Sequence, residues 1–230
     1  MLTNDRSVAL MQTRDLYEKR KDDPMPKKNN TKEEILDAAQ ELFSVNGYEA
    51  TSISQIAEAV GIRKASLYSH YANKQEILDS VVEMVLDGYY KHSIFANANW
   101  EDPAFTKDKT DMTSGAAVKM IQGQIRYILH DPEVQRGRKL LVIEQFRNEE
   151  LSRLQSKQNY EDVVKYFAGM MRFLIRSGVL RDADAEIMAS QFSAPITVWT
   201  NLCDRQPERE EEVMDLIARH ITQFFEIYKK

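Results

Sequence analysis

Several features that mark secreted scaffolds and membrane proteins are missing from this chain of 230 residues. Cys203 is the only cysteine, which excludes a disulfide framework and a cysteine-based metal site and suits a reducing cytosol. We expect its thiol to be buried as a small hydrophobe rather than to act as a redox sensor. No apolar run approaches the roughly 20 residues that a membrane span needs, and the N-terminus has no signal-peptide core. The sequence therefore predicts a cytoplasmic protein with no membrane partner.

The common catalytic motifs are missing as well. His92, His130 and His220 have neither the HExxH pattern nor the i, i+4 spacing of a helical metal site. No serine stands in a GxSxG turn, and no glycine-rich loop is present to hold a phosphate. We therefore expect no catalytic residue, no metal and no cofactor, and we predict that the chain is not an enzyme.

The chain has no overall excess of positive charge. Its net charge of −5 argues against a nonspecific binder of polyanions. A focused basic patch remains compatible with this value, because binding depends on the local potential. Hydrophobic residues at 43% and charged residues at 29% are typical of an ordinary globular protein with enough chain to bury a core.

The most informative stretch, TSISQIAEAVGIRKASLYSHYANK at residues 51–74, has two short helical patterns around one glycine. Ser52 and Gln55 have the spacing of a capping box, which opens the first helix. Gly61 supplies the positive φ that a sharp turn needs. Two helices joined by so short a turn predict a helix-turn-helix motif over about 52–71, with its second helix in the major groove of DNA.

Local charge favours DNA binding over the alternative, which is an ordinary turn between helices of an all-α protein. Residues 59–75 contain no acidic side chain, and their three basic residues are Arg63, Lys64 and Lys74. The wider region 31–90 has four Lys/Arg against ten Asp/Glu, a net charge of −6. A basic island of this kind fits a patch that docks on phosphates better than a generally solvated face.

These residues resemble the TetR/AcrR family of transcriptional regulators. The resemblance covers residues 29–88 and includes I-L-x-A-A-x-x-L-F with Gly47-Tyr48 after it, I-x-x-I-A-x-x-x-G, L-Y-x-H-Y and N-K-x-E-I-L. It implies an all-α fold, with an N-terminal three-helix helix-turn-helix DNA-binding domain followed by a helical ligand-binding and dimerisation domain. It also implies double-stranded operator DNA and a second copy of the chain as partners.

The resemblance further implies which side chains contact DNA. In the family, the Tyr and His of the LYxHF motif and the Lys that opens the next helix hold phosphates. Arg63 departs from the pattern because many relatives have a capping Ser there, and this departure leaves the operator sequence open. The predicted DNA-binding residues are Thr51, Ser52, Ser54, Arg63, Lys64, Ala65, Ser66, Tyr68, Ser69, His70 and Lys74.

We expect three parts along the chain. Residues 1–28 are either a flexible arm with basic residues that lie against DNA or a segment that precedes a translation start at Met25. Residues 29–89 form the DNA-binding domain, and 90–230 form the helical effector-binding and dimerisation domain.

The remainder of the chain predicts more helices and no strand, because apolar residues recur at three- and four-residue spacing. A polar break is expected at 97–114. The expected helices are 74–95, 116–130, a short one after Pro132, a long helical region over 140–175 with its end near Gly178, 183–203 with a bend at Pro195, and 207–228.

One helix-turn-helix reads half an operator, so a homodimer with two-fold symmetry is expected. The resemblance implies that the last two helices pair with their symmetry mates in a four-helix bundle. The alternative is that the apolar stripe of the last helix faces only its own subunit. The predicted dimer interface consists of Val213, Leu216, Ile217, Ile221, Phe224, Phe225 and Tyr228.

The resemblance also implies a small-molecule pocket in the middle helices, whose occupant changes the spacing of the two DNA-binding heads. The alternative for each candidate residue is a plain place in a helical core. Because no candidate is charged, an apolar or aromatic effector is favoured. The candidates are Met120, Tyr127, Phe146, Tyr166, Met170, Phe173 and Trp199.

Together these patterns predict a ligand-responsive repressor that binds a palindromic operator as a homodimer and is released by a small molecule. Repression is favoured over activation, because a dimer on a promoter blocks polymerase without further contacts. The alternative is an architectural or cell-division protein that uses the same head domain without ligand control.

Overall fold

The computed structural model describes residues 30–110 and 112–230, of which 34–230 form one compact unit. The predicted arm or early segment at 1–28 lies outside the described residues. In the described part, β pairing is limited to an isolated bridge between Leu180 and Lys229, so the prediction of an all-α chain is confirmed. No helix there is long and apolar enough to span a membrane.

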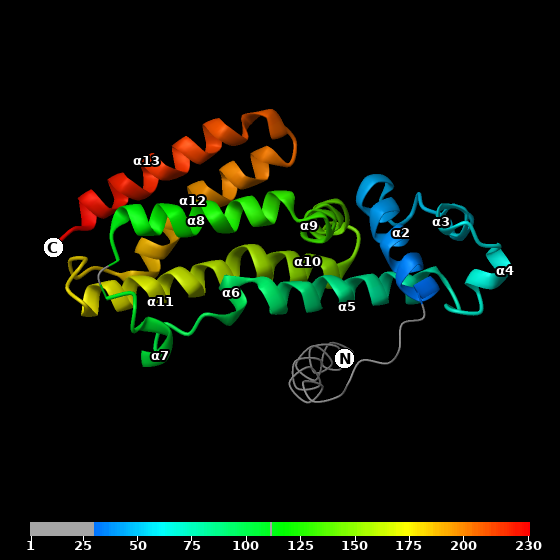
Figure 1. Ribbon diagram of the computed structural model, residues 1–230, viewed down its shortest axis with the longest axis horizontal. Coiled ribbons are helices and arrows are strands. Elements are labelled where there is room, and N and C mark those ends of the chain that lie inside the picture. Colours follow the sequence, from blue (N-terminus) through cyan, green and yellow to red (C-terminus); the bar gives the residue numbers. More distant parts are fainter. Residues whose placement is uncertain (1–29, 111) are drawn as a thin grey trace. The chain divides into compact units, whose positions relative to one another are not determined.

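The helices follow one another along the chain with short connections (Figure 1). A π-helical turn, η2 (Lys157–Glu161), joins α10 to α11, and a 3-10 turn, η3 (Pro207–Arg209), leads into α13. The α-helices are α2 Asn30–Asn46, α3 Ile53–Val60, α4 Lys64–Leu67, α5 Lys74–His92, α6 Ile94–Asn97, α7 Pro103–Thr106, α8 Ser114–His130, α9 Pro132–Glu144, α10 Glu149–Ser156, α11 Asp162–Arg176, α12 Ala185–Cys203 and α13 Glu210–Tyr228.

Local chemistry explains the turn between α3 and α4. The Ser52 hydroxyl accepts from the Gln55 N–H and the Gln55 side chain accepts from the Ser52 N–H, which confirms the predicted capping box. Gly61 has a φ of 74°, and its N–H and that of Ile62 donate to the last carbonyls of α3. Only glycine adopts this left-handed conformation at little cost, so the chain turns there as predicted.

The first hydrophobic core is formed by helices α2, α3, α4 and α5, and Ile35, Phe43 and Leu67 are fully buried in it. Four leucines from later in the chain complete it: Leu140, Leu141, Leu151 and Leu154. The helices of the predicted helix-turn-helix motif therefore share their core with α9 and α10.

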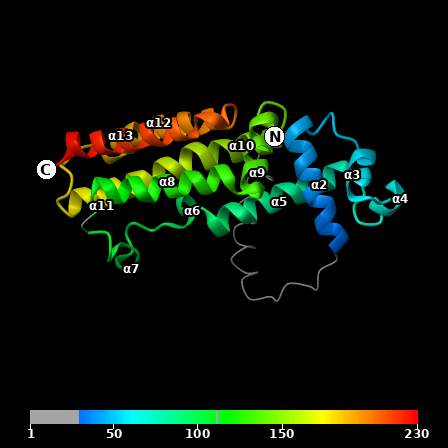
Figure 2. The ribbon, with the colours of Figure 1, turned by 45° about the horizontal axis from the view of Figure 1, so that its top comes forward.

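The second core lies among α8, α11, α12 and α13. In both views, α8 lies beside α13 and α11 beside α12 (Figure 1, Figure 2). Phe167 and Phe192 pack at its centre with ring centroids 4.9 Å apart. Cys203 is buried at the edge of this core, as expected, and burial raises the pKa of its thiol.

The long helical region predicted over 140–175 is interrupted, which corrects that prediction. Helix α9 starts at Pro132 and ends at Glu144, and a turn then leads to Asn148. The Asn148 side chain accepts from the backbone N–H groups of Glu150 and Leu151 and so caps a new helix. The helical segment beginning at Pro132 is also longer than predicted.

Candidate nucleic-acid interface and effector cavity

Helix α4 has one buried residue, Leu67, and its other side chains form an exposed surface. Leu67 has no exposed surface, and the chain on both sides of it is open to solvent. Arg63 precedes the helix and is exposed, and no side-chain hydrogen bond caps the helix there. The exposed predicted DNA contacts of this segment are Arg63, Lys64, Ala65, Ser66, Tyr68 and Ser69, with His70 half-buried.

Two of the three residues predicted to contact DNA at the start of α3 are exposed. Ser52 and Ser54 are exposed, and the Ser52 hydroxyl also caps the helix. Thr51 is buried, and its hydroxyl donates to the Gly47 carbonyl at 2.9 Å. A side chain held in this way is not available to a phosphate, which corrects the predicted DNA contact of Thr51.

Lys74 has a different role from the one that the motif implied. Its ammonium donates to the backbone carbonyls of Tyr48, Glu49 and Thr51 at 2.9, 3.4 and 3.0 Å. It also lies 4.2 Å from the centroid of the Tyr48 ring. An ammonium has three N–H donors, so these carbonyls use all of them. Lys74 therefore fixes the α2–α3 turn, and this contact replaces the predicted hold on phosphate.

Helix α9 contacts the same turn from the other side. The buried Glu144 carboxylate accepts from the Tyr48 N–H at 2.8 Å. Gly47, with a φ of 80°, brings the backbone close: a Cβ there would lie 3.0 Å from Glu144 Oε1. At the other end of α9, the Gln40 side chain of α2 donates to the Glu133 carbonyl and accepts from Arg136 Nε. Helix α9 thus contacts α2 near its start and the α2–α3 turn at its end.

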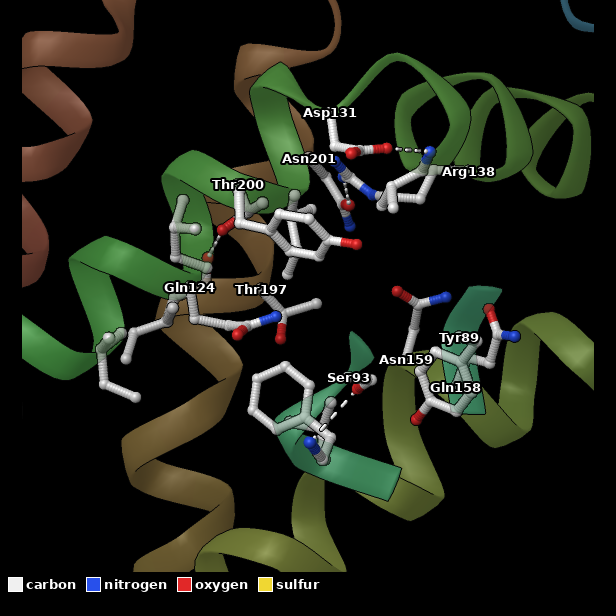
Figure 3. A pocket seen from close by; sticks show the side chains of 18 of the residues that line it. Tyr89, Ser93, Gln124, Asp131, Arg138, Gln158, Asn159, Thr197, Thr200 and Asn201 are labelled. Carbon is white, nitrogen blue, oxygen red and sulfur yellow. Dashed lines mark hydrogen bonds between the residues drawn. The ribbon is translucent and has the colours of Figure 1, made fainter. Parts of the chain in front are cut away.

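A cavity of about 240 Å³ lies beside α9 (Figure 3). Helices α5, α6, α8, α9, α11 and α12 and the turn η2 supply its walls. Its apolar lining includes Phe95, Ile121, Ile125, Val163, Phe167 and Ile196, and its polar lining includes Gln124, Tyr127, Asp131, Arg138, Gln158, Asn159, Thr197 and Asn201.

The only basic residue among the lining residues is Arg138, and it is paired. Its Nη2 donates to Asp204 Oδ2 at 2.7 Å and to Asn201 Oδ1 at 3.3 Å. Burial lowers the pKa of the Arg138 guanidinium, and the nearby Asp204 carboxylate opposes this shift. Burial likewise raises the pKa of Asp204, against the attraction of Arg138. Each charge therefore stabilises the other against the cost of burial. Of the two residues, Arg138 lines the cavity.

Of the seven residues predicted to line a pocket, only Tyr127 lines this cavity. Tyr166, Met170 and Phe173 are buried in the second core, because Trp100 packs on this face of α11. Trp100 fits there because Gly169 has no side chain: a Cβ would lie 3.0 Å from the indole. The other three are elsewhere: Met120 and Trp199 pack against the second core, and Phe146 is 91% exposed.

Sequence reasoning missed most of the polar lining, although two signals were present. Gln124 stands among Ile121, Ile125 and Ile128 on the apolar face of α8, where a polar residue is out of pattern. In α12, Ser193 and Thr200 are buried among apolar neighbours on the inner face of the helix. Arg138 and Gln158 gave no such signal, because their segments have few apolar residues that define a face.

The predicted dimer interface also needs correction. Val213, Ile217 and Ile221 are fully buried within their own chain, and Phe224 and Phe225 are nearly so. Leu216 and Tyr228 are half-buried. The apolar stripe of α13 faces α8 and α12, which was the alternative to the predicted interface. The outer faces of α12 and α13 instead present exposed Ile187, Val198 and Ile227.

Comparison with known proteins identifies the family of the helix-turn-helix segment. Residues 35–81 match the family described as bacterial regulatory proteins, tetR family. The helix-turn-helix segment is therefore of the tetR-family type.

Among relatives, two proteins described as the biofilm operon icaADBC HTH-type negative transcriptional regulator IcaR are similar to part of the chain. The one from Staphylococcus epidermidis is 50% identical over 52 residues, which cover 23% of this chain and 28% of the relative. The one from Staphylococcus aureus strain Newman is 41% identical over 68 residues, which cover 30% of this chain and 36% of the relative. The chain thus spans about a third of the length of these relatives.

Solved structures show the same fold over most of the chain. A tetR-family transcriptional regulator from Mesorhizobium loti has a TM-score of 0.61 at 19% identity and covers 90% of this chain and 100% of its own. SmeT, the repressor of the Stenotrophomonas maltophilia multidrug efflux pump SmeDEF, has a TM-score of 0.59 at 20% identity, covering 88% of this chain and 92% of its own. The helical region after the helix-turn-helix therefore has the same fold as in these two structures.

Proposed function

We propose that this protein is a transcriptional repressor that binds operator DNA through α3 and α4. The observation that carries the proposal is the surface around α4, where Arg63, Lys64 and Tyr68 are exposed beside buried Leu67. The head is also similar to that of IcaR, which is described as a negative transcriptional regulator. Occupation of a promoter is sufficient to block polymerase, so repression needs no further contact.

The exposed side chains divide into two groups in this proposal. Lys64, Ala65 and Ser66 face base edges in the major groove, where a lysine can donate to guanine. Arg63, Tyr68, Ser69 and His70 contact phosphates, together with Ser52 and Ser54 from the start of α3, and fix the register of the head on the duplex. Lys74 acts through the α2–α3 turn rather than on DNA.

The proposal includes a homodimer, because one head reads only half of a two-fold operator. Ile187 and Val198 are eleven residues apart on α12, which puts them on one face of the helix. Both are more than half exposed, and so is Ile227 of α13. We place the dimer contact on these outer faces of α12 and α13, in place of the buried stripe of α13.

The cavity beside α9 is the proposed effector site, and α9 is the proposed coupling element. Glu133, Val134 and Arg138 of α9 line the cavity, and Glu144 of the same helix holds the α2–α3 turn. An effector that binds two positions of α9 with different affinity shifts the head between them and so changes operator affinity.

In this proposal, residues 29–89 are the DNA-binding domain and 90–230 the effector-binding and dimerisation domain. The head also needs leucines of α9 and α10 for its core, so the two domains are not independent. A regulator of bacterial transcription acts where the chromosome is, which places the protein in the cytoplasm.

Fluorescence anisotropy with labelled duplexes from the DNA that flanks the coding region tests the proposal. We expect binding that weakens linearly with the logarithm of salt concentration, because each contacted phosphate releases counterions. A duplex that contains an inverted repeat should bind more tightly than a scrambled one at the same salt. A protein that binds no duplex in a salt-dependent way would contradict the proposal.

A further inference from the structure

The effector cavity has two hydrogen-bond donors that the protein leaves without a partner. Within the described part of the chain, Gln158 Nε2 and Arg138 Nη1 are buried and donate to no protein oxygen, and Oδ1 of Asp204, the ion-pair partner of Arg138, is buried without a donor. Gln158 is 9% exposed, and both side chains line the same cavity, one from η2 and one from α9 (Figure 3). An unpaired buried donor is costly, so such donors are rare unless something else satisfies them.

The backbone at Gln158 is unusual in the same place. Residues Lys157–Glu161 form a π-helical turn between α10 and α11. Single π-helical turns inside α-helical regions are rare and frequently stand at functional sites. The turn puts Gln158 and Asn159 side by side at the cavity, and Asn159 is already bonded to Gln155. Gln158 is thus the free amide of the pair.

The charges around these donors define what they can accept. Arg138 is neutralised by Asp204, and the other charged lining residues are Asp131 and Glu133, both acidic. A carboxylate ligand would enter a wall that carries no uncompensated positive charge and would lose its hydration there. A cationic amine has donors and no acceptor, so it could not satisfy Gln158 or Arg138. A ligand with a neutral oxygen avoids the cost of burying a charge and can accept a hydrogen bond from the unpaired donor.

The remaining walls are apolar, and the space is small. Phe95 and Phe167 contribute rings, and Ile121, Ile125 and Ile196 contribute aliphatic surface. The volume of about 240 Å³ lies just below the range of roughly 300–1,000 Å³ typical of ligand pockets. It suits a compact ligand rather than a large drug-like molecule.

We propose that the effector is a small uncharged molecule with an apolar, ring-sized body and one carbonyl-type oxygen, which accepts a hydrogen bond from Gln158. This inference rests on the proposed function, because it takes the cavity to be the effector site. It replaces the broader expectation of an apolar or aromatic effector with a definite polar requirement.

Four probes of nearly equal size test the requirement by isothermal titration calorimetry on the full chain. Benzylacetone has a neutral carbonyl, butylbenzene lacks the oxygen, hydrocinnamate has an anionic carboxylate, and phenylpropylamine is cationic. We expect benzylacetone to bind roughly tenfold more tightly than butylbenzene, which is the effect of one hydrogen bond. Equal affinity for these two, tighter binding of hydrocinnamate or the amine, or no binding of benzylacetone would overturn the proposal.

The variant Gln158→Leu tests the residue that carries the inference. It should bind benzylacetone and butylbenzene equally, while Gln206→Leu, which makes the same change in an exposed loop, should keep the preference. The free Gln158→Leu protein should be at least as heat-stable as the wild type, because a leucine removes a buried unpaired donor. A preserved preference, or a lower melting temperature, would show that Gln158 serves the protein itself and would overturn the proposal.

Operator binding by the same preparation separates this inference from the function on which it rests. A protein that binds operator DNA but shows no carbonyl preference would retain the proposed function and lose the proposed effector class. If the protein prefers the carbonyl probe but binds no DNA, the proposed ligand class of the cavity would stand and the proposed repressor function would fail.

Discussion

Lys64 and Lys74 stand ten residues apart in one basic island, yet their surroundings differ. Lys64 is exposed at the start of α4, whereas the Lys74 ammonium is held by three backbone carbonyls of the α2–α3 turn. From the motif alone, both lysines were predicted to contact DNA. Their substitution should therefore have different consequences.

Replacement of Lys64 by alanine should change affinity selectively by sequence. If Lys64 reads a guanine, loss of the contact should cost about 1–3 kcal/mol on the operator and much less on a scrambled duplex. Anisotropy titrations on both duplexes give this difference. Lys165→Ala, an exposed lysine on α11, serves as the control and should bind both duplexes as the wild type does. An equal loss on both duplexes would show that Lys64 contacts only phosphate.

Replacement of Lys74 by alanine should act on stability. Hydrogen bonds from a charged donor are worth about 1.5–3 kcal/mol, and we expect the free energy of unfolding to fall by an amount in this range. Urea denaturation followed by circular dichroism measures it. The slope of operator affinity against salt should stay unchanged, since no phosphate contact is removed. A flatter slope with unchanged stability would restore the phosphate role that the motif implied.

The difference between these lysines shows which residue roles can be predicted from the sequence. Ser52, Gln55 and Gly61 act on neighbours within five residues, so spacing alone predicted their capping and turning roles. Lys74 is held by backbone carbonyls that the fold brings to it from up to 26 residues away. Such partners depend on tertiary structure, which a local pattern does not contain.

At the scale of elements, α9 links the cavity to the DNA-binding head. Its first half lines the cavity, and its last residue, Glu144, accepts from the Tyr48 N–H. A helix moves as a rigid rod over this length, so a displacement at the cavity reaches the turn before α3.

Replacement of Glu144 by alanine should loosen that turn. The Tyr48 N–H would lose its acceptor, and we expect the free energy of unfolding to fall by about 1–3 kcal/mol. Hydrogen exchange should become faster at the Tyr48 amide. Glu150→Ala, an exposed glutamate in the first turn of α10, is the control and should leave exchange at Tyr48 unchanged. Equal protection of the Tyr48 amide in Glu144→Ala and wild type would contradict the coupling role of α9.

Most helices were predictable from apolar spacing, but the break between α9 and α10 was missed. The signal was present, since Asn148 is followed by Glu149 and Glu150, a common start for a helix. The place of Trp100 was not predictable, because it lies in a stretch that reads as a polar break. Its packing against Gly169 and the aromatic residues of α11 removed the pocket expected there.

At the scale of the molecule, the proposed dimer uses the outer faces of α12 and α13. Val198→Asp puts a charge in the centre of this surface, where an unpaired carboxylate would be desolvated on association. We expect the variant to be monomeric by light scattering at micromolar concentration and to bind a full operator no more tightly than a half-site. Phe146→Asp changes another exposed hydrophobic residue and should remain dimeric. An unchanged dimer in Val198→Asp would place the interface elsewhere.

The whole-molecule prediction from sequence was right for the all-α fold and for the helix-turn-helix at its start. It was less accurate for surfaces formed between helices. The stripe of α13 was assigned to a partner because its apolar residues are numerous, but α8 and α12 of the same chain cover them. An amphipathic helix shows which face is buried and leaves open what buries it.

The central claim is that the surface around α4 reads an operator. Its most direct test is a footprint of the purified protein on sheared DNA from the source genome, with sequencing of the protected fragments. We expect a few sites beside promoters, each an inverted repeat whose half-sites lie about one or two helical turns apart, and their loss in Lys64→Ala. Many dispersed sites without a repeat, or protection that Lys64→Ala leaves unchanged, would contradict the claim.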